Sequence, residues 1–209
     1  MAERNGEGDG SLPPGKLRFV VTYLEMTRPP TEPRPVAPDK DLTLRRADRP
    51  AVAFYRELYD RVGKPWMWFE RGKLSDQELA AIITDPAVEI HVLHEGNQLA
   101  GYVELDRRSL ADVEIAYFGI VPERIGRGFG AYLMRWALDM AFGYRAPRVW
   151  LHTCTLDHPK AVDFYKRAGF SAYKTEVEII DDPRLTGLVP RDSAPHIPID
   201  VRSVGRGSG

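Results

Sequence analysis

The sequence has little of several features that would assign it to a specialised class. It contains one cysteine, so it cannot form an internal disulfide, which is typical of a protein in the reducing cytosol. Lysine and arginine number 29 against 30 aspartates and glutamates, which gives a formal net charge of −1. This balance gives no sign of a nucleic-acid partner or of binding to an anionic membrane surface.

Long apolar runs are also missing. No stretch approaches the roughly 18 apolar residues of a membrane-spanning helix. The first fifteen residues are polar and glycine-rich, without the apolar core of a signal peptide. Apolar residues at 43% and charged residues at 28% are ordinary for a globular domain, and 209 residues can bury one sizeable core. We therefore expect a cytoplasmic protein with no membrane partner.

The most informative stretch is a glycine-rich turn between a predicted strand and a predicted helix. Residues 113–121 are rich in β-branched and aromatic side chains, which indicates a strand. Residues 129–140 carry apolar side chains at helical spacing, and Gly143 ends this helix. Small residues in the turn let backbone N–H groups at a helix N-terminus surround an anion, and Arg124 and Arg127 add positive charge. The turn is predicted to bind a pyrophosphate, and it reads Ile125-Gly126-Arg127-Gly128-Phe129-Gly130.

Two other phosphate-binding motifs fit this turn less well. Gly126-x-Gly128-x-x-Ala131 is close to a dinucleotide fingerprint, which should follow the first strand and precede an acidic residue by about 20 positions. Here several predicted strands come before the turn, and residues 147–150 carry no acid. A P-loop is excluded because no Gly-Lys-Ser/Thr is present.

Two blocks of the chain carry a resemblance to a known family. The turn resembles motif A of the GNAT superfamily of acetyl-CoA-dependent N-acetyltransferases, usually written Gln/Arg-x-x-Gly-x-Gly/Ala, with Gly128 and Gly130 on the two small positions. Residues 158–170 resemble motif B, Asn-x-x-Ala-x-x-x-Tyr-x-x-x-Gly-Phe. The sequence departs from these patterns at Ile125, where Gln or Arg is usual, and at His158, where Asn is usual. The resemblance is sharp over residues 112–170 and looser over about 42–180.

The resemblance implies an α/β (α+β) GNAT fold, a mixed, mostly antiparallel, twisted sheet with helices on both faces. We expect one GNAT domain over residues 16–181, between flexible tails at 1–15 and 182–209. Asp157 or His158 is expected to cap the last helix. The patterns predict helices that begin near residues 50, 76, 129 and 159, and strands at 17–26, 41–47, 88–95, 98–106, 113–121, 148–155 and 171–180.

The resemblance also implies that acetyl-CoA is the co-substrate. A backbone N–H near Ile120 would polarise the thioester carbonyl, and Gly119 would ease the approach of the ligand to the strand. No metal is expected, because His91 and His94 point to opposite faces of a strand and the other histidines show no ligand spacing. The residues expected to bind the co-substrate are Phe118, Gly119, Ile120, Arg124, Ile125, Gly126, Arg127, Gly128, Phe129, Gly130, Ala131 and His158.

Glu114 is the candidate general base. Strict alternation along the strand places it on one face with Ala116, Phe118 and Ile120, where desolvation would raise its pKa toward a value useful for deprotonating an ammonium group. In the histone-acetyltransferase branch of the family, the glutamate that acts as general base stands as far before the glycines of motif A as Glu114 does here. The alternative is that Glu114 is a structural residue at the strand edge, bonded to solvent or to Arg107. The amine would then lose its proton through water.

Tyr165 falls on the tyrosine of motif B, which in many family members donates a proton or hydrogen bond to the departing thiolate. Its helical spacing fits a core tyrosine equally well. Cys154 would be the nucleophile of a covalent mechanism, and alternation places His152 on the same face. A buried, inert thiol is the favoured interpretation of this cysteine.

Trp66, Trp68 and Phe69 either line an acceptor pocket, with a cation–π site for an amine, or plug the edge of the core. The predicted activity is transfer of acetyl to a primary amine by direct attack in a ternary complex. The acceptor would be a small molecule or a peptide amine, and a homodimer is the commonest assembly of such folds. The alternatives are a CoA-binding sensor or docking module without turnover, and a transferase for longer acyl chains.

Overall fold

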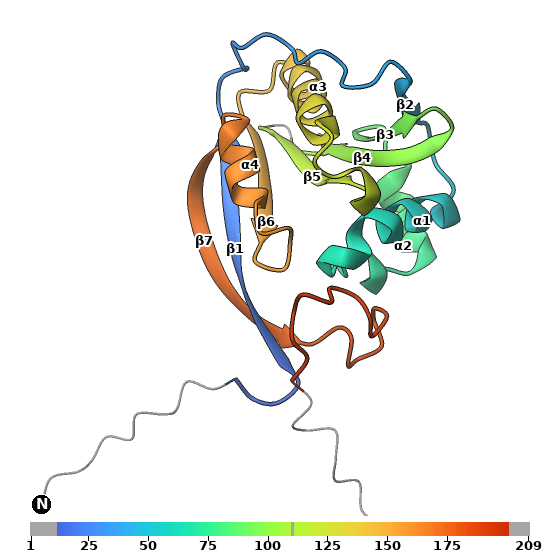
Figure 1. Ribbon diagram of the computed structural model, residues 1–209, viewed down its shortest axis with the longest axis vertical. Coiled ribbons are helices and arrows are strands. Elements are labelled where there is room, and N and C mark those ends of the chain that lie inside the picture. The colour runs from blue at the N-terminus through green and yellow to red at the C-terminus, as the bar shows by residue number, and fades with distance from the viewer. Residues whose placement is uncertain (1–11, 110, 201–209) are drawn as a thin grey trace, which may run out of the picture.

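Seven strands form one mixed, twisted sheet in the computed structural model, which describes residues 12–109 and 111–200 (Figure 1). The strand order across the sheet is β2-β3-β4-β5-β6-β1-β7, and every neighbouring pair is antiparallel except β5 and β6. The strands are β1 (Lys16–Met26), β2 (Leu42–Ala47), β3 (Val88–Glu95), β4 (Gln98–Asp106), β5 (Val113–Ile120), β6 (Val149–Cys154) and β7 (Ser171–Asp181).

Helices cover both faces of the sheet, which confirms the predicted GNAT-like arrangement. Residues of α1 (Val52–Gly63) and α2 (Asp76–Ile83) bury their apolar sides against one face, and residues of α3 (Phe129–Gly143) and α4 (Ala161–Arg167) against the other. The short 3-10 turns are η1 (Lys64–Trp66), η2 (Arg71–Lys73) and η3 (Pro122–Arg124). Within the described residues, no helix is both long enough and apolar enough to cross a membrane.

The first strand lies far from the strand that follows it in sequence. β1 is inserted between β6 and β7, and it pairs antiparallel with both (Figure 1). The long connector between β1 and β2 passes over α3, where the Arg34 guanidinium lies 2.6 Å from the Asp139 carboxylate. Two parts of the chain that are distant in sequence therefore close one half of the sheet.

Residues 182–200, called the C-terminal segment below, differ from the flexible tail predicted for 182–209. Asp182 and Arg184 form a buried ion pair of 2.7 Å, and Arg184 also donates to the backbone carbonyl of Ile197 at 2.7 Å. The Ala194 backbone N–H donates to the carbonyl of Lys64 at 3.1 Å. The prediction was wrong for these residues because a single buried arginine satisfies the carbonyl groups of an irregular segment. Residues 1–11 and 201–209, which belong to the two predicted tails, lie outside the described residues.

Candidate active site

The strands β5 and β6 separate partway along their length, and the candidate site forms where they part (Figure 1). They pair at Val113 with Val149 and at Glu114 with Trp150, and the described residues show no pair between them beyond these. The rest of β5 therefore presents backbone N–H and C=O groups that β6 does not pair. Two cavities open at this gap, one lined by residues of α3 and α4 and the other by residues of β1 and the loop after α1.

The first cavity has a volume of about 360 Å³ and contains the glycine-rich turn. Gly126 and Gly128 both have φ of +85°, a backbone conformation that L side chains rarely adopt. Gly128 is the N-cap of α3, and no side chain caps this helix, so the N–H groups of its first turn remain open to an anion. The lining residues are Trp66, Trp68, Phe118, Gly119, Ile120, Ile125, Gly126, Gly128, Gly130, Ala131, Asp157, His158, Lys160, Ala161, Phe164, Tyr165 and Arg167.

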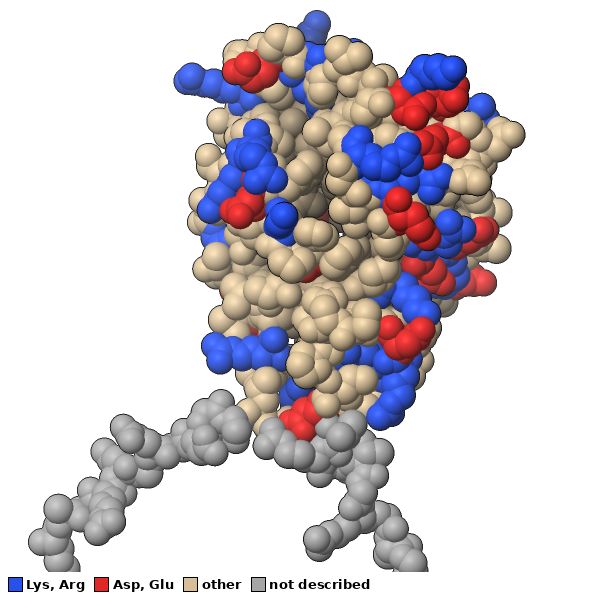
Figure 2. Space-filling view, in the orientation of Figure 1, with Lys and Arg blue, Asp and Glu red and all other residues tan. Residues whose placement is uncertain are grey.

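Three residues expected to bind the co-substrate do not line this cavity. Arg124 and Arg127 both pair with the Glu95 carboxylate, and Arg127 holds the pKa of Glu95 below its usual value. Phe129 is buried in the core under α3. The positive charges that do line the cavity belong to Lys160 and Arg167, beside α4 and within it. Figure 2 shows a hollow bordered mostly by uncharged atoms, with positively charged atoms over α4 beside it.

Gly119 has a packing role in addition to the one expected of it. A Cβ at this position would lie 2.2 Å from Cγ1 of Val62 on α1 and 3.5 Å from the Trp68 ring. The absence of a side chain therefore lets α1 pack closely on β5. The backbone of Gly119 still lines the first cavity.

The second cavity has a volume of about 130 Å³ and is acidic and aromatic. Its charged lining residues are Glu70, Asp157 and Glu178, accompanied by His152, and the lining set contains no lysine or arginine. Trp66, Trp68 and Phe69, the expected acceptor residues, all line it. The remaining lining residues are Phe19, Val21, Tyr23, Met67, Ile115, Ala116, Tyr117, Phe118, Cys154, Leu156 and Tyr165.

Five residues line both cavities, and they mark the place where two ligands would meet: Trp66, Trp68, Phe118, Asp157 and Tyr165. The Tyr165 ring packs edge-on against Phe118, with centroids 6.3 Å apart, and burial raises the pKa of its hydroxyl. Because the pKa is raised, the phenol keeps its proton throughout the working pH range.

Asp157 joins the two cavities instead of capping a helix. Its carboxylate accepts hydrogen bonds from Trp68 Nε1 at 3.2 Å, Thr153 Oγ1 at 2.7 Å and the Cys154 backbone N–H at 2.9 Å. The predicted capping role was wrong for Asp157. His158 instead accepts a hydrogen bond at Nδ1 from the Lys160 backbone N–H, at 3.1 Å, in the turn before α4, which begins at Ala161. Asp157 thus fixes Trp68 against the loop that precedes α4.

Glu114 lies on a different face of β5 from the one predicted. The register between β4 and β5 shifts at Ala116, because Leu105 pairs with Ile115 whereas its neighbour Glu104 pairs with Tyr117. This bulge inserts one residue and reverses the alternation beyond it. As a result Phe118 and Ile120 pack toward α3 and α4, and Glu114 shares its face with Tyr117.

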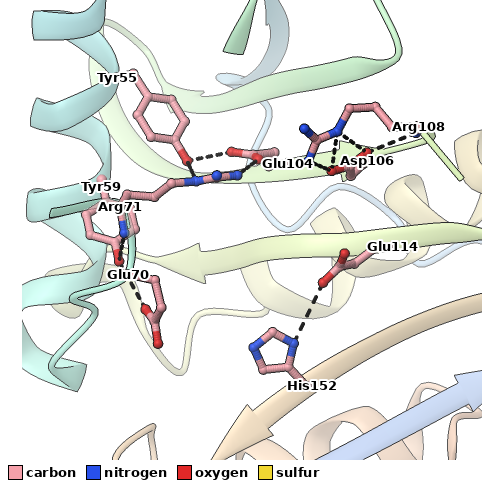
Figure 3. Close-up of polar contacts among 9 residues, drawn as sticks. All are labelled: Tyr55, Tyr59, Glu70, Arg71, Glu104, Asp106, Arg108, Glu114 and His152. Carbon is pink, nitrogen blue, oxygen red and sulfur yellow. Dashed lines mark hydrogen bonds and ion pairs between the residues drawn. The ribbon is translucent and has the colours of Figure 1, made fainter. Parts of the chain in front are cut away.

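The surroundings of Glu114 raise its pKa to about 7. Burial is the main cause, followed by repulsion from the carboxylates of Asp106 and Glu104 on β4. Glu114 is absent from the lining of both cavities. Its Oε1 lies 3.7 Å from Nδ1 of His152, and Figure 3 shows the carboxylate directed toward this ring across the gap between the strands.

A buried polar cluster lies on the other side of Glu114, under α1 (Figure 3). Glu104 is fully buried, accepts a hydrogen bond of 2.5 Å from the Tyr55 hydroxyl, and pairs with the Arg71 guanidinium at 2.5 Å. Arg71 also lies over the Tyr117 ring, 5.0 Å from its centroid. Because each polar group in this cluster has a partner, the cluster fixes η2 against the sheet at the wall of the second cavity.

Cys154 lines the second cavity, but its chemistry is that of an inert thiol. Burial, reinforced by the nearby Asp157 carboxylate, raises its pKa to about 12. The thiolate needed for nucleophilic attack is therefore scarce near neutral pH. This agrees with the favoured interpretation of the sequence, in which Cys154 forms no acetyl-enzyme.

Several residues of the site were not expected from the sequence. Lys160 and Arg167 stand inside motif B, at positions that the motif leaves unspecified. Glu70 and Glu178 come from the loop after α1 and from β7, and no local pattern connects them. For His152 one signal was present, since alternation along β6 places it on the same face as Cys154.

Comparison with known proteins agrees with this geometry. The family model described as the Acetyltransferase (GNAT) family matches residues 55–170. Spermidine N(1)-acetyltransferase from Vibrio cholerae is 31% identical over 146 residues, which cover 63% of this chain and 80% of that protein.

Solved structures show the same fold at lower identity. A GCN5-related N-acetyltransferase from Sphaerobacter thermophilus has a TM-score of 0.57 at 16% identity, over 81% of this chain and 52% of that one. An aminoglycoside acetyltransferase from an uncultured soil metagenomic sample has a TM-score of 0.53 at 13% identity, over 65% of this chain and 92% of that one. A functionally unknown conserved protein from Staphylococcus epidermidis has a TM-score of 0.56 at 18% identity, over 79% of this chain and 62% of that one. This chain thus spans less than two thirds of two of these structures.

Proposed function

The chain belongs to the GNAT acetyltransferase family, and we propose that it transfers an acetyl group from acetyl-CoA to a primary amine by direct attack within a ternary complex. The observation that carries this proposal is the meeting of two cavities at the gap between β5 and β6, with Tyr165 and Asp157 lining both. A ligand bound in each cavity would place its reacting end beside these two shared residues. Such an arrangement suits a reaction between two bound substrates, because it replaces a bimolecular encounter by proximity.

The first cavity supports the assignment of acetyl-CoA as the donor. Its uncapped helix N-terminus and the positive φ of Gly126 and Gly128 favour a pyrophosphate that approaches the backbone closely. Lys160 and Arg167 would add positive charge for the phosphates of the nucleotide. The unpaired edge of β5 beyond Glu114 offers backbone hydrogen bonds to the amides of the pantetheine arm.

The second cavity supports a cationic amine as the acceptor. Three carboxylates, Glu70, Asp157 and Glu178, line it together with the Trp66 and Trp68 rings, so a protonated aliphatic amine meets both opposite charge and π faces. Several carboxylates in one cavity favour an acceptor with more than one positive charge, such as a di- or polyamine. The relative that is 31% identical to this chain is a spermidine acetyltransferase, which agrees with this class.

The reaction needs a base for the ammonium group and an acid for the departing sulfur. In our proposal Glu114 receives the ammonium proton, and its pKa of about 7 suits this role near neutral pH. The free amine attacks the thioester carbon, whose oxygen is polarised by a backbone N–H near Ile120. The carbon–sulfur bond then breaks, and the thiolate receives a proton or hydrogen bond from the Tyr165 hydroxyl.

The proposal can be tested by titration calorimetry followed by an activity screen. Micromolar binding of acetyl-CoA, with no binding of NADH, is expected for the first cavity. A panel of amines, with release of free thiol as the signal, should then show turnover with diamines and polyamines. No binding of acetyl-CoA would contradict the donor assignment, and binding without turnover on any amine would favour a CoA sensor.

A further inference from the structure

The candidate base and the candidate acceptor cavity are separated by one side chain. Glu114 lines neither cavity, whereas His152 lines the second cavity and lies beside Glu114, with Nδ1 3.7 Å from Oε1 (Figure 3). An ammonium group bound in the second cavity therefore meets the imidazole before it can reach the carboxylate. No family motif marks His152, because it stands on β6 between the two blocks of resemblance.

The fold orients the imidazole for contact on both of its edges. His152 lies on the face of β6 that also carries Glu114 across the gap, while its neighbours Leu151 and Thr153 are buried on the other face. The ring packs beside Tyr23 on β1, with centroids 5.8 Å apart. With Nδ1 directed at a carboxylate, the neutral tautomer carries its hydrogen on Nδ1 and leaves Nε2 as an acceptor.

Charged groups surround this pair on both sides. Glu114 faces Glu104 and Asp106 on β4 and the guanidinium groups of Arg71 and Arg108, and burial together with the two carboxylates raises its pKa to about 7. On the other side, the ring of Tyr23 beside His152 is also approached by the carboxylates of β7: Glu176 and Glu178. Glu114 can therefore hold a proton near neutral pH, which suits it to accept one from the imidazole beside it.

We propose that His152 is a catalytic residue that takes a proton from the acceptor ammonium at Nε2 and passes a proton from Nδ1 to the Glu114 carboxylate. One N–H bond of the ammonium breaks and one forms at Nε2, while the Nδ1–H bond breaks and an O–H bond forms on Glu114. The amine lone pair is then free to attack the thioester. The imidazole returns to its first tautomer when Glu114 gives its proton back to Nδ1 and Nε2 releases its proton to solvent.

This inference rests on the proposed amine acetyltransferase activity and adds the path of the proton. It is tested with His152→Gln, Glu114→Gln, the double variant, and His94→Gln as a control histidine elsewhere on the sheet. His152→Gln is expected to lower kcat by about 100-fold, with the Kd of acetyl-CoA unchanged as evidence of correct folding. The double variant should be no slower than the slower single variant, because both residues act on one proton.

The pH profile separates a proton path from a structural role. Wild-type kcat should rise with pH and level off above about 7, whereas in His152→Gln it should keep rising toward the pKa of the amine itself. Free imidazole should restore part of the activity of His152→Ala, and His94→Gln should behave as wild type.

Three outcomes would overturn the inference. A kcat of His152→Gln within about threefold of wild type would exclude the relay, since general acid–base steps contribute far more than this. Multiplicative losses in the double variant would show that the two residues act separately. A wild-type protein that binds acetyl-CoA but acetylates no amine would instead contradict the proposed function, and the relay with it.

Discussion

The two cavities that meet between β5 and β6 have walls of opposite charge. Lys160, Arg167 and the N-terminus of α3 line only the first cavity, Glu70 and Glu178 line only the second, and Asp157 lies where the two meet. An anionic donor and a cationic acceptor would therefore each be attracted to its own side of the gap. The comparison teaches that one break in a sheet can sort two substrates by charge and still join their reacting ends.

The cavities also differ in the part of the chain that builds them. The first depends largely on backbone, because an uncapped helix and two glycines with positive φ form the end that we propose binds phosphate. The second depends on side chains of β1, β6, β7 and the loop after α1, brought together only by the fold. Changes to the backbone turn should thus act on donor binding, and changes to the acidic side chains on acceptor binding.

The largest effect is expected from Gly128→Glu. A Cβ here is strained at φ +85° and would lie 3.3 Å from Pro38, and the carboxylate would repel phosphate. Calorimetry should show acetyl-CoA binding weakened by at least about 100-fold, or about 2.7 kcal/mol. Gly187→Glu, with φ of +77° on an exposed turn outside both cavities, is the matched control and should bind normally. Equal losses in the two variants would attribute the effect to backbone strain alone.

Tyr165→Phe should leave both substrates bound but slow the chemistry. The phenol lines both cavities, and its loss removes the donor to the departing thiolate. Steady-state kinetics should show kcat lowered by about 100-fold, with the KM of each substrate within a few-fold of wild type. A large rise in KM with normal kcat would make Tyr165 a packing residue between the cavities.

Removing negative charge from the second cavity should weaken binding of the acceptor and leave binding of the donor unchanged. Glu70→Gln and Glu178→Gln are each expected to raise the KM of a diamine by up to about fivefold, as for a partly exposed ion pair. The Kd of acetyl-CoA should stay constant, and a monoamine should be affected less than a diamine. Weaker binding of acetyl-CoA together with an unchanged KM of the diamine would reverse the assignment of the cavities.

A smaller effect is expected on the pH dependence of wild-type kcat/KM. Repulsion from Asp106 helps to raise the pKa of Glu114 to about 7, and the base works only when deprotonated, so activity should increase through this pH. Asp106→Asn removes one repelling charge, and the rise should move to lower pH. A profile that does not respond to this variant would show that another group controls the rise.

Local elements of this fold could be predicted well from the sequence, because they depend on short-range patterns. The strand before the glycine turn and the apolar stripe of α3 lie where the spacing of apolar residues and the positions of proline and glycine predicted them. The position of β1 between β6 and β7 could not be predicted, since periodicity identifies a strand but not its neighbours. The packing of residues 182–200 was missed because Arg184, besides its pair with Asp182, bonds backbone carbonyls of later residues, and no sequence pattern marks such contacts.

The candidate site likewise combines residues that local sequence patterns predict with residues whose position depends on the tertiary fold. Gly128, Tyr165 and His158 could be found because a local motif carries them, and all three line the first cavity. The face of Glu114 could not be predicted, because alternation assumes a regular strand and the bulge at Ala116 adds a residue. Asp157 was interpreted as a helix cap because Asp before a helix is normally one, whereas here its oxygens accept from Trp68 and Thr153.

The initial-velocity pattern tests the central claim most directly. Free-thiol release is measured while acetyl-CoA and a polyamine such as spermidine are varied together. If both substrates are bound together between β5 and β6, the double-reciprocal lines should intersect, which is the pattern of a ternary complex. Parallel lines would contradict this, because they indicate a covalent acetyl-enzyme, and Cys154 in the second cavity would then have to be reconsidered as a nucleophile.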